Sequence, residues 1–471
     1  MSGEGFVSRD AARVQEEIRR FLDIGPVQVA ELDLPGRDAS GVAALSPGPG
    51  SPPVTHGEVF VLVRRGGLPV GTLLGTVPEG ADPRAVLVGL AQQLIAEERG
   101  EGDRGGDGAR AETPSVPSVR SAPVPSATVP STTVVIATRD RADQLARALD
   151  SLLAQDHPDF EIVVVDNAPA TDATRDLIER KYAERVRHVV EPVPGLAVAH
   201  NRGVEAAHGE VIAFTDDDVV ADPRWLTELT APFAADPGLG CATGLILPAR
   251  LRTPAQVLLE SHGGFAKGFT ARTYDPYDPP ADEPLFPFTA GRFGSGANMA
   301  FRTDVLRAIG GFDPATGVGT PARGGDDLYG FVRVLAQGHR LRYTPRALVW
   351  HHHRETWHDL ETQAYGYGAG LTAYLTAILV NRPALLPAFL ARLPRGLAHA
   401  RTLTASRGAG AGARSAPGGH DERTHVWPRR LSRLQRRGML YGPVGYLRAR
   451  ARRALGAARR RVPYGASGGT E

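Results

Sequence analysis

The stretch Val211-Ile-Ala-Phe-Thr-Asp-Asp-Asp218 decides the fold of this chain. Its apolar first half indicates a buried strand, and that strand runs directly into three consecutive carboxylates. Like charges at a sheet edge repel one another unless a cation lies between them. Oxygen ligands suit Mg²⁺ or Mn²⁺, and such ions often hold phosphates. The alternative is a solvated acidic turn that caps the helix expected near Pro223.

The sequence around this stretch predicts strands that alternate with helices. Strands are expected at 133–137, 160–165, 186–190 and 210–214, and helices at 143–155, 171–182 and 195–207. This alternation implies an α/β fold, with a parallel sheet flanked by helices on both faces. Ligands of such sheets bind beyond the carboxyl ends of the strands. Three polar clusters are expected there: Thr138-Arg139, Asp166-Asn167 and Asp216 to Asp218.

Charge is distributed unevenly along the chain. The net charge is only +2, but residues 381–471 hold 19 arginines and three acidic residues, whereas the rest holds 35 basic and 49 acidic residues. Residues 429–461 interleave arginine with apolar residues, which is typical of an anchor on an anionic membrane surface. A solvated basic helix is the alternative. No nucleic acid is expected as a partner, because no recognition module accompanies the charge.

The composition bounds the compartment and the number of domains. A chain of 471 residues holds two or three domains. Its single cysteine, Cys241, excludes an internal disulfide framework and fits a reducing compartment. We find no leader peptide and no uninterrupted apolar stretch of roughly 18 residues. The expected localisation is cytoplasmic, with peripheral attachment to the inner face of the cell membrane.

Four regions are expected along the chain. Residues 1–100 form a small α+β module of unknown role, with a hairpin around Arg65-Gly66-Gly67. Residues 101–131, rich in Gly, Pro and Ser, form a flexible linker. Residues 132–370 form the α/β domain, and residues 371–471 form a basic helical extension.

Seven short motifs along the chain resemble, in their sequence and order, those of a family 2 glycosyltransferase of the GT-A fold. The resemblance covers about half of the chain, roughly residues 132–367. It implies a Rossmann-like sheet that binds a nucleotide sugar. It also implies an inverting enzyme that uses Mg²⁺ or Mn²⁺ to transfer a sugar from a UDP, dTDP or GDP donor to a hydroxyl acceptor, such as a glycan, lipid or other cell-envelope precursor. The motifs are Val134-Val-Ile-Ala-Thr-Arg-Asp-Arg141, Val163-Val-Val-Asp-Asn-Ala168, Gly195-Leu-Ala-Val-Ala-His-Asn-Arg-Gly203, Phe214-Thr-Asp-Asp-Asp218, Gly296-Ala-Asn-Met-Ala-Phe301, Gly311-Phe-Asp313 and Gly324-Gly-Asp-Asp-Leu328.

The resemblance implies a metal site. Asp216 and Asp218 match the outer acids of the family's Asp-X-Asp motif, and Asp217 is the middle residue, counted with the donor-binding residues. Because the middle residue is also acidic, the sequence leaves open which two acids face the metal. His351 matches the position of a third ligand in several GT-A enzymes, and His353 is its neighbour on the same face of an extended segment. The alternative is a surface histidine cluster.

The resemblance also implies a catalytic base. Asp327 matches its position, and partial burial with nearby negative charge is expected to raise its pKa. Asp326 stands where the family commonly has Glu and is counted with the donor-binding residues. The alternative for both residues is to cap the helix expected from Leu328 to Gln337.

The remaining donor-binding residues follow from the same resemblance. Thr138 and Arg139 would line the nucleotide pocket, and Asp166 would accept a hydrogen bond from an imide N–H of the base, or else cap a helix. Asn201 and Arg202 would lie beside the ribose and the diphosphate, although Arg202 also fits an exposed helix charge.

Two positions of these motifs carry a reservation. Many relatives have Arg where this chain has His200, which puts a direct arginine contact with the donor at that position in doubt. Asn298 would face the donor or acceptor sugar, with a turn residue as the alternative.

Two other functions remain as alternatives. A catalytically inactive nucleotide-sugar-binding or scaffold protein would be expected to lose the acidic residues, and all of them are present. A sugar nucleotidyltransferase would carry a glycine-rich loop after the first strand, but Thr138-Arg-Asp-Arg141 has no glycine.

Overall fold

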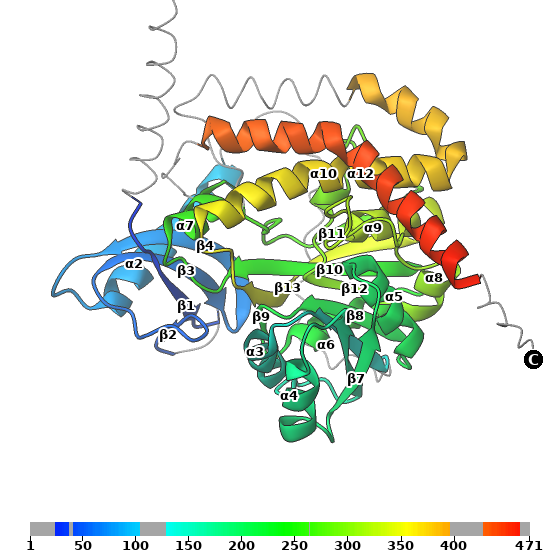
Figure 1. Ribbon diagram of the computed structural model, residues 1–471. Coiled ribbons are helices and arrows are strands. Elements are labelled where there is room, and N and C mark those ends of the chain that lie inside the picture. The colour runs from blue at the N-terminus through cyan, green and yellow to red at the C-terminus, as the bar shows by residue number, and fades with distance from the viewer. Residues whose placement is uncertain (1–23, 37–40, 104–128, 263, 396–426, 462–471) are drawn as a thin grey trace, which may run out of the picture.

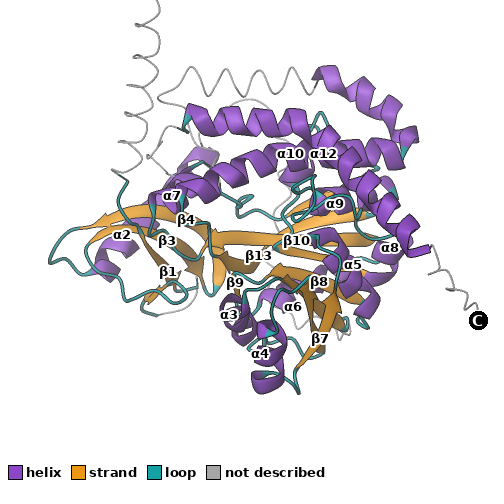
Figure 2. Cartoon of the chain, viewed as in Figure 1, coloured by secondary structure: helices purple, strands orange, loops and turns teal. Residues whose placement is uncertain are grey.

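The computed structural model describes residues 24–36, 41–103, 129–262, 264–395 and 427–461. Two sheets organise these residues, and a layer of long helices crosses above them (Figure 1). The smaller sheet has the order β2-β1-β3-β4, and the larger has the order β11-β13-β10-β12-β8-β5-β6-β7, with β9 beside β13. Helices cover the larger sheet on both sides (Figure 2).

The larger sheet is mixed. Its strands are β5 (Thr132–Thr138), β6 (Phe160–Asn167), β7 (Val186–Glu191), β8 (Val211–Asp216), β9 (Val219–Ala221), β10 (Leu239–Pro248), β11 (Arg272–Tyr274), β12 (Asn298–Arg302) and β13 (Arg340–His351). The four strands predicted from the sequence, β5 to β8, pair in parallel, which confirms that part of the prediction. The sheet as a whole is mixed because β12, which was not predicted, runs antiparallel to both β8 and β10.

Alternate residues of the central strands serve two separate cores. Val134 and Ile136 of β5 pack with one set of helices, whereas Val135 between them packs with the other. Both faces of the strand are therefore buried, which explains its continuous apolar sequence. The first set is α3 (Ala142–Leu152), α4 (Ala173–Lys181) and α6 (Trp225–Ala235), and the second is α5 (Leu196–Ala206), α8 (Thr303–Ala308), α9 (Asp326–Ala336), α10 (Trp357–Asn381) and α12 (Arg429–Arg461).

The N-terminal module is an α+β unit, as predicted. Its elements are β1 (Gln28–Leu34), β2 (Ala44–Pro47), β3 (Gly57–Arg65), β4 (Leu68–Val77) and α2 (Pro83–Asp103). The predicted hairpin is β3–β4, and β1 lies parallel to β3. Arg64 joins the module to the larger sheet, because its guanidinium contacts Glu31 at 2.7 Å and Asp222 at 2.6 Å.

The C-terminal helices α10 and α12 pack closely along their lengths. A Cβ added at Gly368 of α10 or at Gly438 of α12 would collide with the backbone of the other helix. Among the described residues, no single helix is long and apolar enough to cross a membrane. Helix α10 meets that test only together with residues 383–395, and the two are bent by 109°. Helix α10 ends at Asn381. The linker predicted at 101–131 lies largely outside the described residues.

Candidate active site

The carboxyl ends of three parallel strands meet at one edge of the larger sheet. Thr138 at the end of β5 pairs with Asp166 of β6, and Ala137 pairs with Asp216 of β8. The polar clusters predicted from the sequence therefore lie side by side. Strand β9 then turns back and pairs with the end of β13, where His351 lies opposite Val219. This pairing brings a histidine from far along the chain to the acidic cluster.

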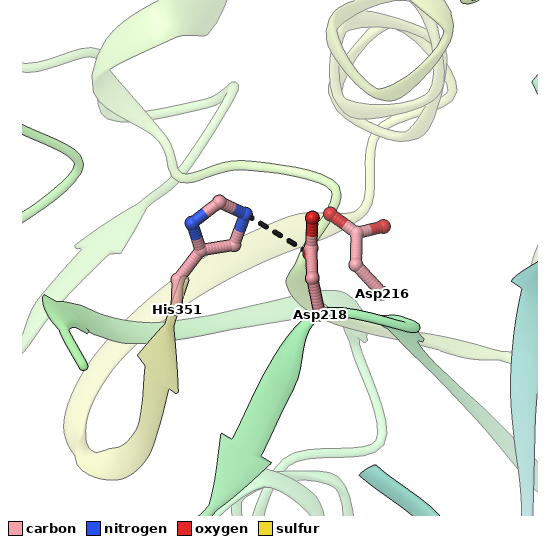
Figure 3. A group of neighbouring side chains, drawn as sticks. All are labelled: Asp216, Asp218 and His351. Atoms are coloured by element: carbon pink, nitrogen blue, oxygen red, sulfur yellow. Dashed lines mark ion pairs between the residues drawn. The ribbon is translucent and has the colours of Figure 1, made fainter. Parts of the chain in front are cut away.

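The three aspartates at the end of β8 separate into two groups. Asp217 is buried and accepts hydrogen bonds from Thr138 Oγ1 at 2.7 Å and from Arg141 at 3.1 Å. Asp216, Asp218 and His351 form the other group, in which one ligand atom from each lies within 4.8 Å of the others (Figure 3). The first and third acids, together with His351, are therefore the candidate cation ligands.

Burial and mutual repulsion set the protonation of this cluster. Burial, with the charge of Asp218, raises the pKa of Asp216 to about 7. Burial opposes ionisation of Asp218 too, but the neighbouring His351 outweighs it and lowers the pKa of Asp218. In return Asp218 raises the pKa of His351 against the effect of burial. The cluster therefore favours a positive charge at its centre.

The side chains of the cluster fit a divalent metal. The buried Oδ1 of Asp218 lies 3.3 Å from His351 Nε2, and it accepts no hydrogen bond from any described residue. Such an unsatisfied oxygen is expected where a cation would bind. Two carboxylates and one imidazole are hard and borderline donors, a set that suits Mn²⁺ and, with its oxygens, Mg²⁺.

Asp327 lies at the N-terminus of α9 and is partly exposed. Its Oδ2 accepts a hydrogen bond from the Gly296 amide at 2.9 Å, and its Oδ1 accepts one from the Leu328 amide at 2.8 Å. Burial and the charge of Asp326 nevertheless raise the pKa of Asp327 to about 6. A carboxylate with this pKa is suited to accept a proton near neutral pH.

His200, on α5, lies beside Asp326, the buried neighbour of Asp327. Its Nδ1 is 3.2 Å from Oδ2 of the buried Asp326, and its ring packs edge-on against Phe214. Gly325 is the N-cap of α9, and Asp326 is an acidic residue of its first turn.

The residues predicted to bind the nucleotide differ in burial: Asp166 and Thr138 are buried, and Arg139 is exposed. Asp166 is buried with its Oδ2 3.4 Å from His188 Nε2, and burial raises its pKa. Its Oδ1 is buried too, and hydrogen bonds from His188 and Thr174 act against the rise in its pKa. Thr138 is buried and committed to Asp217, whereas the Arg139 side chain is 53% exposed, with only Asp140 nearby at 3.8 Å.

Three predicted contacts with the donor are corrected by the structure. Asn298 is fully buried, accepts a hydrogen bond from Trp225 Nε1 and donates two to backbone carbonyls, so it does not face a sugar. Asn201 both donates to and accepts from the backbone of Phe312. Arg202 forms an exposed ion pair with Glu205 at 3.1 Å, as its alternative interpretation expected. All three side chains have their partners within the protein.

Sequence reasoning missed two residues that shape the site. Arg141 lies 3.1 Å from Asp217 and 3.7 Å from Asp218, and its position inside the first motif was a signal that it faces the acids. Glu260, on α7 (Pro254–Ser261), lies 3.0 Å from His353, and no pattern in the sequence links these two residues.

Comparisons with known proteins agree with this geometry. Residues 133–310 match the family model described as Glycosyl transferase family 2. The chain is 27% identical over 238 residues to the pre-mycofactocin glycosyltransferase of Mycobacterium tuberculosis, covering 50% of this chain and 46% of that protein. It is 36% identical over 110 residues to an uncharacterized glycosyltransferase of Nostoc sp., covering 23% of this chain and 34% of that protein. The chain thus spans less than half the length of these two relatives.

A solved structure also resembles this one. It is the mannosyltransferase from Pyrobaculum calidifontis in complex with GDP-Man and Mn²⁺, with 20% identity and a TM-score of 0.41, covering 77% of this chain and 98% of that one.

Proposed function

We propose that this chain, whose residues 133–310 form a family 2 glycosyltransferase domain, transfers a sugar from a nucleotide-diphosphate donor to a hydroxyl acceptor with inversion. The acceptor would be a glycan, lipid or other cell-envelope precursor. The observation that carries the proposal is the cluster of Asp216, Asp218 and His351, together with a second acidic pair, Asp326 and Asp327, at the N-terminus of α9. One group is suited to a cation, and the other presents a partly exposed carboxylate with a raised pKa.

Asp327 is the proposed base. Its two backbone hydrogen bonds fix the carboxylate and leave each oxygen a further lone pair. The acceptor hydroxyl gives its proton to Asp327 while its oxygen bonds to the anomeric carbon of the donor. The bond from that carbon to the diphosphate oxygen breaks, and its electron pair leaves with the nucleoside diphosphate. A single displacement of this kind inverts the anomeric centre.

Asp216, Asp218 and His351 are the proposed metal ligands. A Mn²⁺ or Mg²⁺ held by these residues would neutralise the charge that develops on the departing diphosphate. Asp217 supports the site indirectly, because Thr138 and Arg141 hold its carboxylate away from the cluster. Imidazole ligation favours Mn²⁺ over Mg²⁺.

Asp166 is the proposed contact for the nucleotide base. Its carboxylate, at the end of β6, is a hydrogen-bond acceptor that suits the ring N–H of uracil, thymine or guanine. UDP, dTDP and GDP sugars are therefore the proposed donors. Thr138 and Arg139 border the same strand end, where Arg139 is exposed and free to reach a ligand.

The C-terminal helix α12 is the proposed membrane contact, with the protein on the cytoplasmic face. Leu440, Val444, Leu447 and Leu455 are 82%, 46%, 52% and 66% exposed and recur at helical spacing on one face. The preceding turns of that face carry exposed arginines, among them Arg433, Arg436 and Arg437. An apolar stripe that continues a basic one suits an anionic bilayer surface. The division at residues 100, 131 and 370 is likewise our proposal.

Donor hydrolysis in the presence of Mn²⁺ tests the proposed function. The protein is incubated with UDP, dTDP and GDP sugars, and the released nucleotide and the anomeric configuration of the product are measured by NMR. We expect metal-dependent release from at least one donor with inverted product. Retention of configuration would refute Asp327 as the base of a single displacement. An absence of nucleotide binding in thermal-shift assays across all donors would refute the enzyme assignment.

A further inference from the structure

A chain of hydrogen-bonding groups runs behind the proposed metal site. Oε2 of Glu260 lies 3.0 Å from Nε2 of His353, and Nδ1 of His353 lies 3.2 Å from Nδ1 of His351. Nε2 of His351 then lies 3.3 Å from Oδ1 of Asp218. Both histidines are buried, and Glu260 is the carboxylate at the far end. Two imidazoles thus connect one carboxylate to another.

The donor and acceptor roles along this chain are fixed from the Glu260 end. An ionised carboxylate only accepts, so Nε2 of His353 must carry a hydrogen. In a neutral His353 the other nitrogen, Nδ1, is then an acceptor. Nδ1 of His351 must therefore donate, which leaves the lone pair of a neutral His351 on Nε2. That lone pair faces the unsatisfied oxygen of Asp218, and two acceptors meet there unless a proton or a metal cation lies between them.

We propose that Glu260 and His353 are positioning residues that hold His351 in the tautomer whose Nε2 binds the metal. The inference rests on the metal site of the proposed function. Neither residue touches the cation. Their effect is to fix which nitrogen of His351 is free and how its ring is turned, and partners of this kind strengthen metal binding.

The surrounding packing supports this role. Helix α7 carries Glu260 and begins with a capping box between Thr253 and Gln256. The side chain of Gln256 donates to the backbone carbonyl of His353 at 3.1 Å, so α7 holds both the main chain and the side chain of that residue. The ring of Phe265 packs against both histidines, with centroid distances of 5.3 Å to the His351 ring and 5.5 Å to the His353 ring.

His352 provides a matched control within the same segment. It lies between the two histidines, but its side chain takes no part in the chain of contacts. Only its backbone amide reaches the site, where it donates to the carbonyl oxygen of Asp218 at 2.9 Å. We call the hydrogen-bonded series Glu260–His353–His351 the relay. Because His352 is adjacent to His353, comparing His352→Gln with His353→Gln separates loss of the relay from a general effect on this segment.

Mn²⁺ titration of the full chain, followed by electron paramagnetic resonance of the free ion, tests the inference. His353→Gln should weaken Mn²⁺ binding by about 10- to 100-fold, the effect usual for such partners. Glu260→Gln should weaken it less, since the amide oxygen can still accept, and His352→Gln should leave it within about 2-fold of the wild type. Nitrogen-15 spectra of the metal-free and Mg²⁺-loaded protein should show a hydrogen on Nδ1 of His351.

Each outcome distinguishes the inference from the function on which it rests. Equal Mn²⁺ affinity in the wild type, His353→Gln and Glu260→Gln would overturn the relay and leave the metal site standing. The relay would also be overturned by a hydrogen on Nε2 of His351 in the Mg²⁺-loaded protein. Failure of the wild type to bind Mn²⁺ would overturn the metal site itself, and the relay with it. If His353→Gln does not fold, Glu260→Gln and the nitrogen spectra decide.

Discussion

The backbone amide of Gly296 donates a hydrogen bond of 2.9 Å to Oδ2 of Asp327. Gly296 precedes β12 and Asp327 is the second residue of α9, so this bond ties the loop before β12 to the helix that carries the proposed base. The bond fixes the position of the carboxylate, and Oδ2 keeps a second lone pair that can accept a proton. The bond is the clearest sign that Asp327 is arranged to act on something outside the protein.

Asp327→Asn should abolish transfer while nucleotide binding is retained. An amide cannot accept the acceptor's proton, and general-base catalysis contributes about 10²- to 10⁴-fold. Initial rates of sugar transfer measure the loss, and thermal shift with Mn²⁺ and nucleotide checks binding. Asp304→Asn, an exposed acid on α8, is the matched control and should keep full activity. Full activity of Asp327→Asn would show that another group is the base.

The rate should depend on pH through the same residue. Burial and Asp326 raise the pKa of Asp327 to about 6, and a base must be deprotonated to act. We therefore expect kcat/KM to rise as the pH increases through about 6 and to level off above it. Rates at saturating Mn²⁺ between pH 5 and 8 measure the profile. A rate that falls as the pH rises over this range would contradict the assignment.

Neighbouring aspartates of the triplet should behave differently. Asp218→Ala removes a proposed ligand, so Mn²⁺-dependent nucleotide binding should be lost. Asp217→Asn should keep Mn²⁺ affinity within a few fold, because that side chain is committed to Thr138 and Arg141. Calorimetric titration of each variant with Mn²⁺ distinguishes them. Equal losses in the two variants would argue against the separation seen in the structure.

Asn298→Ala should destabilise the fold rather than alter donor recognition. The substitution leaves the indole N–H of Trp225 and two buried carbonyls without their partner. Each unsatisfied buried group costs about 1–3 kcal/mol, so the free energy of unfolding should fall by about 2 kcal/mol or more. Chemical denaturation measures the change. An unchanged stability combined with a raised KM for the donor would restore the original prediction of a sugar contact.

Membrane attachment should depend on the apolar face of α12. Replacing both Leu440 and Leu447 with Asp puts charge where the helix would enter the bilayer, so binding to vesicles with anionic lipid should fall by at least about 10-fold. Flotation of the protein with such vesicles measures it. Val42→Asp, at an apolar residue 78% exposed on the N-terminal module, is the control. Wild-type protein that never floats with anionic vesicles would refute the membrane contact.

The sequence was most informative where local pattern and chemistry coincide. Strands β5 to β8 follow from their apolar runs, and the edge that gathers Thr138, Asp166 and Asp216 follows from parallel pairing. The antiparallel β12 could not be predicted in the same way. A long stretch with few regular elements separates β12 from β10. The direction of β12 depends on where that stretch returns to the sheet.

Side-chain roles were harder to predict because they depend on distant partners. Asn201 and Asn298 stand inside recognisable motifs, yet Asn201 binds backbone 111 residues away and Asn298 binds backbone 53 residues away. The separation of Asp217 from Asp218 depends on Thr138 and on β9, neither of which is visible in the triplet itself. These relationships exist only once the chain has folded.

The glycine two residues before the proposed base depends on close packing against α10. Gly325 adopts a φ of +87°, and a Cβ there would lie 2.5 Å from the carbonyl oxygen of Gly370 on α10. Helix α10 is in turn held by α12, so the loop before Asp327 rests on the C-terminal extension. The part recognisable by family, residues 133–310, ends before Asp327 and His351. Transplanting that part alone into another protein would leave out the proposed base Asp327, the proposed third ligand His351 and the helices that support the loop before Asp327.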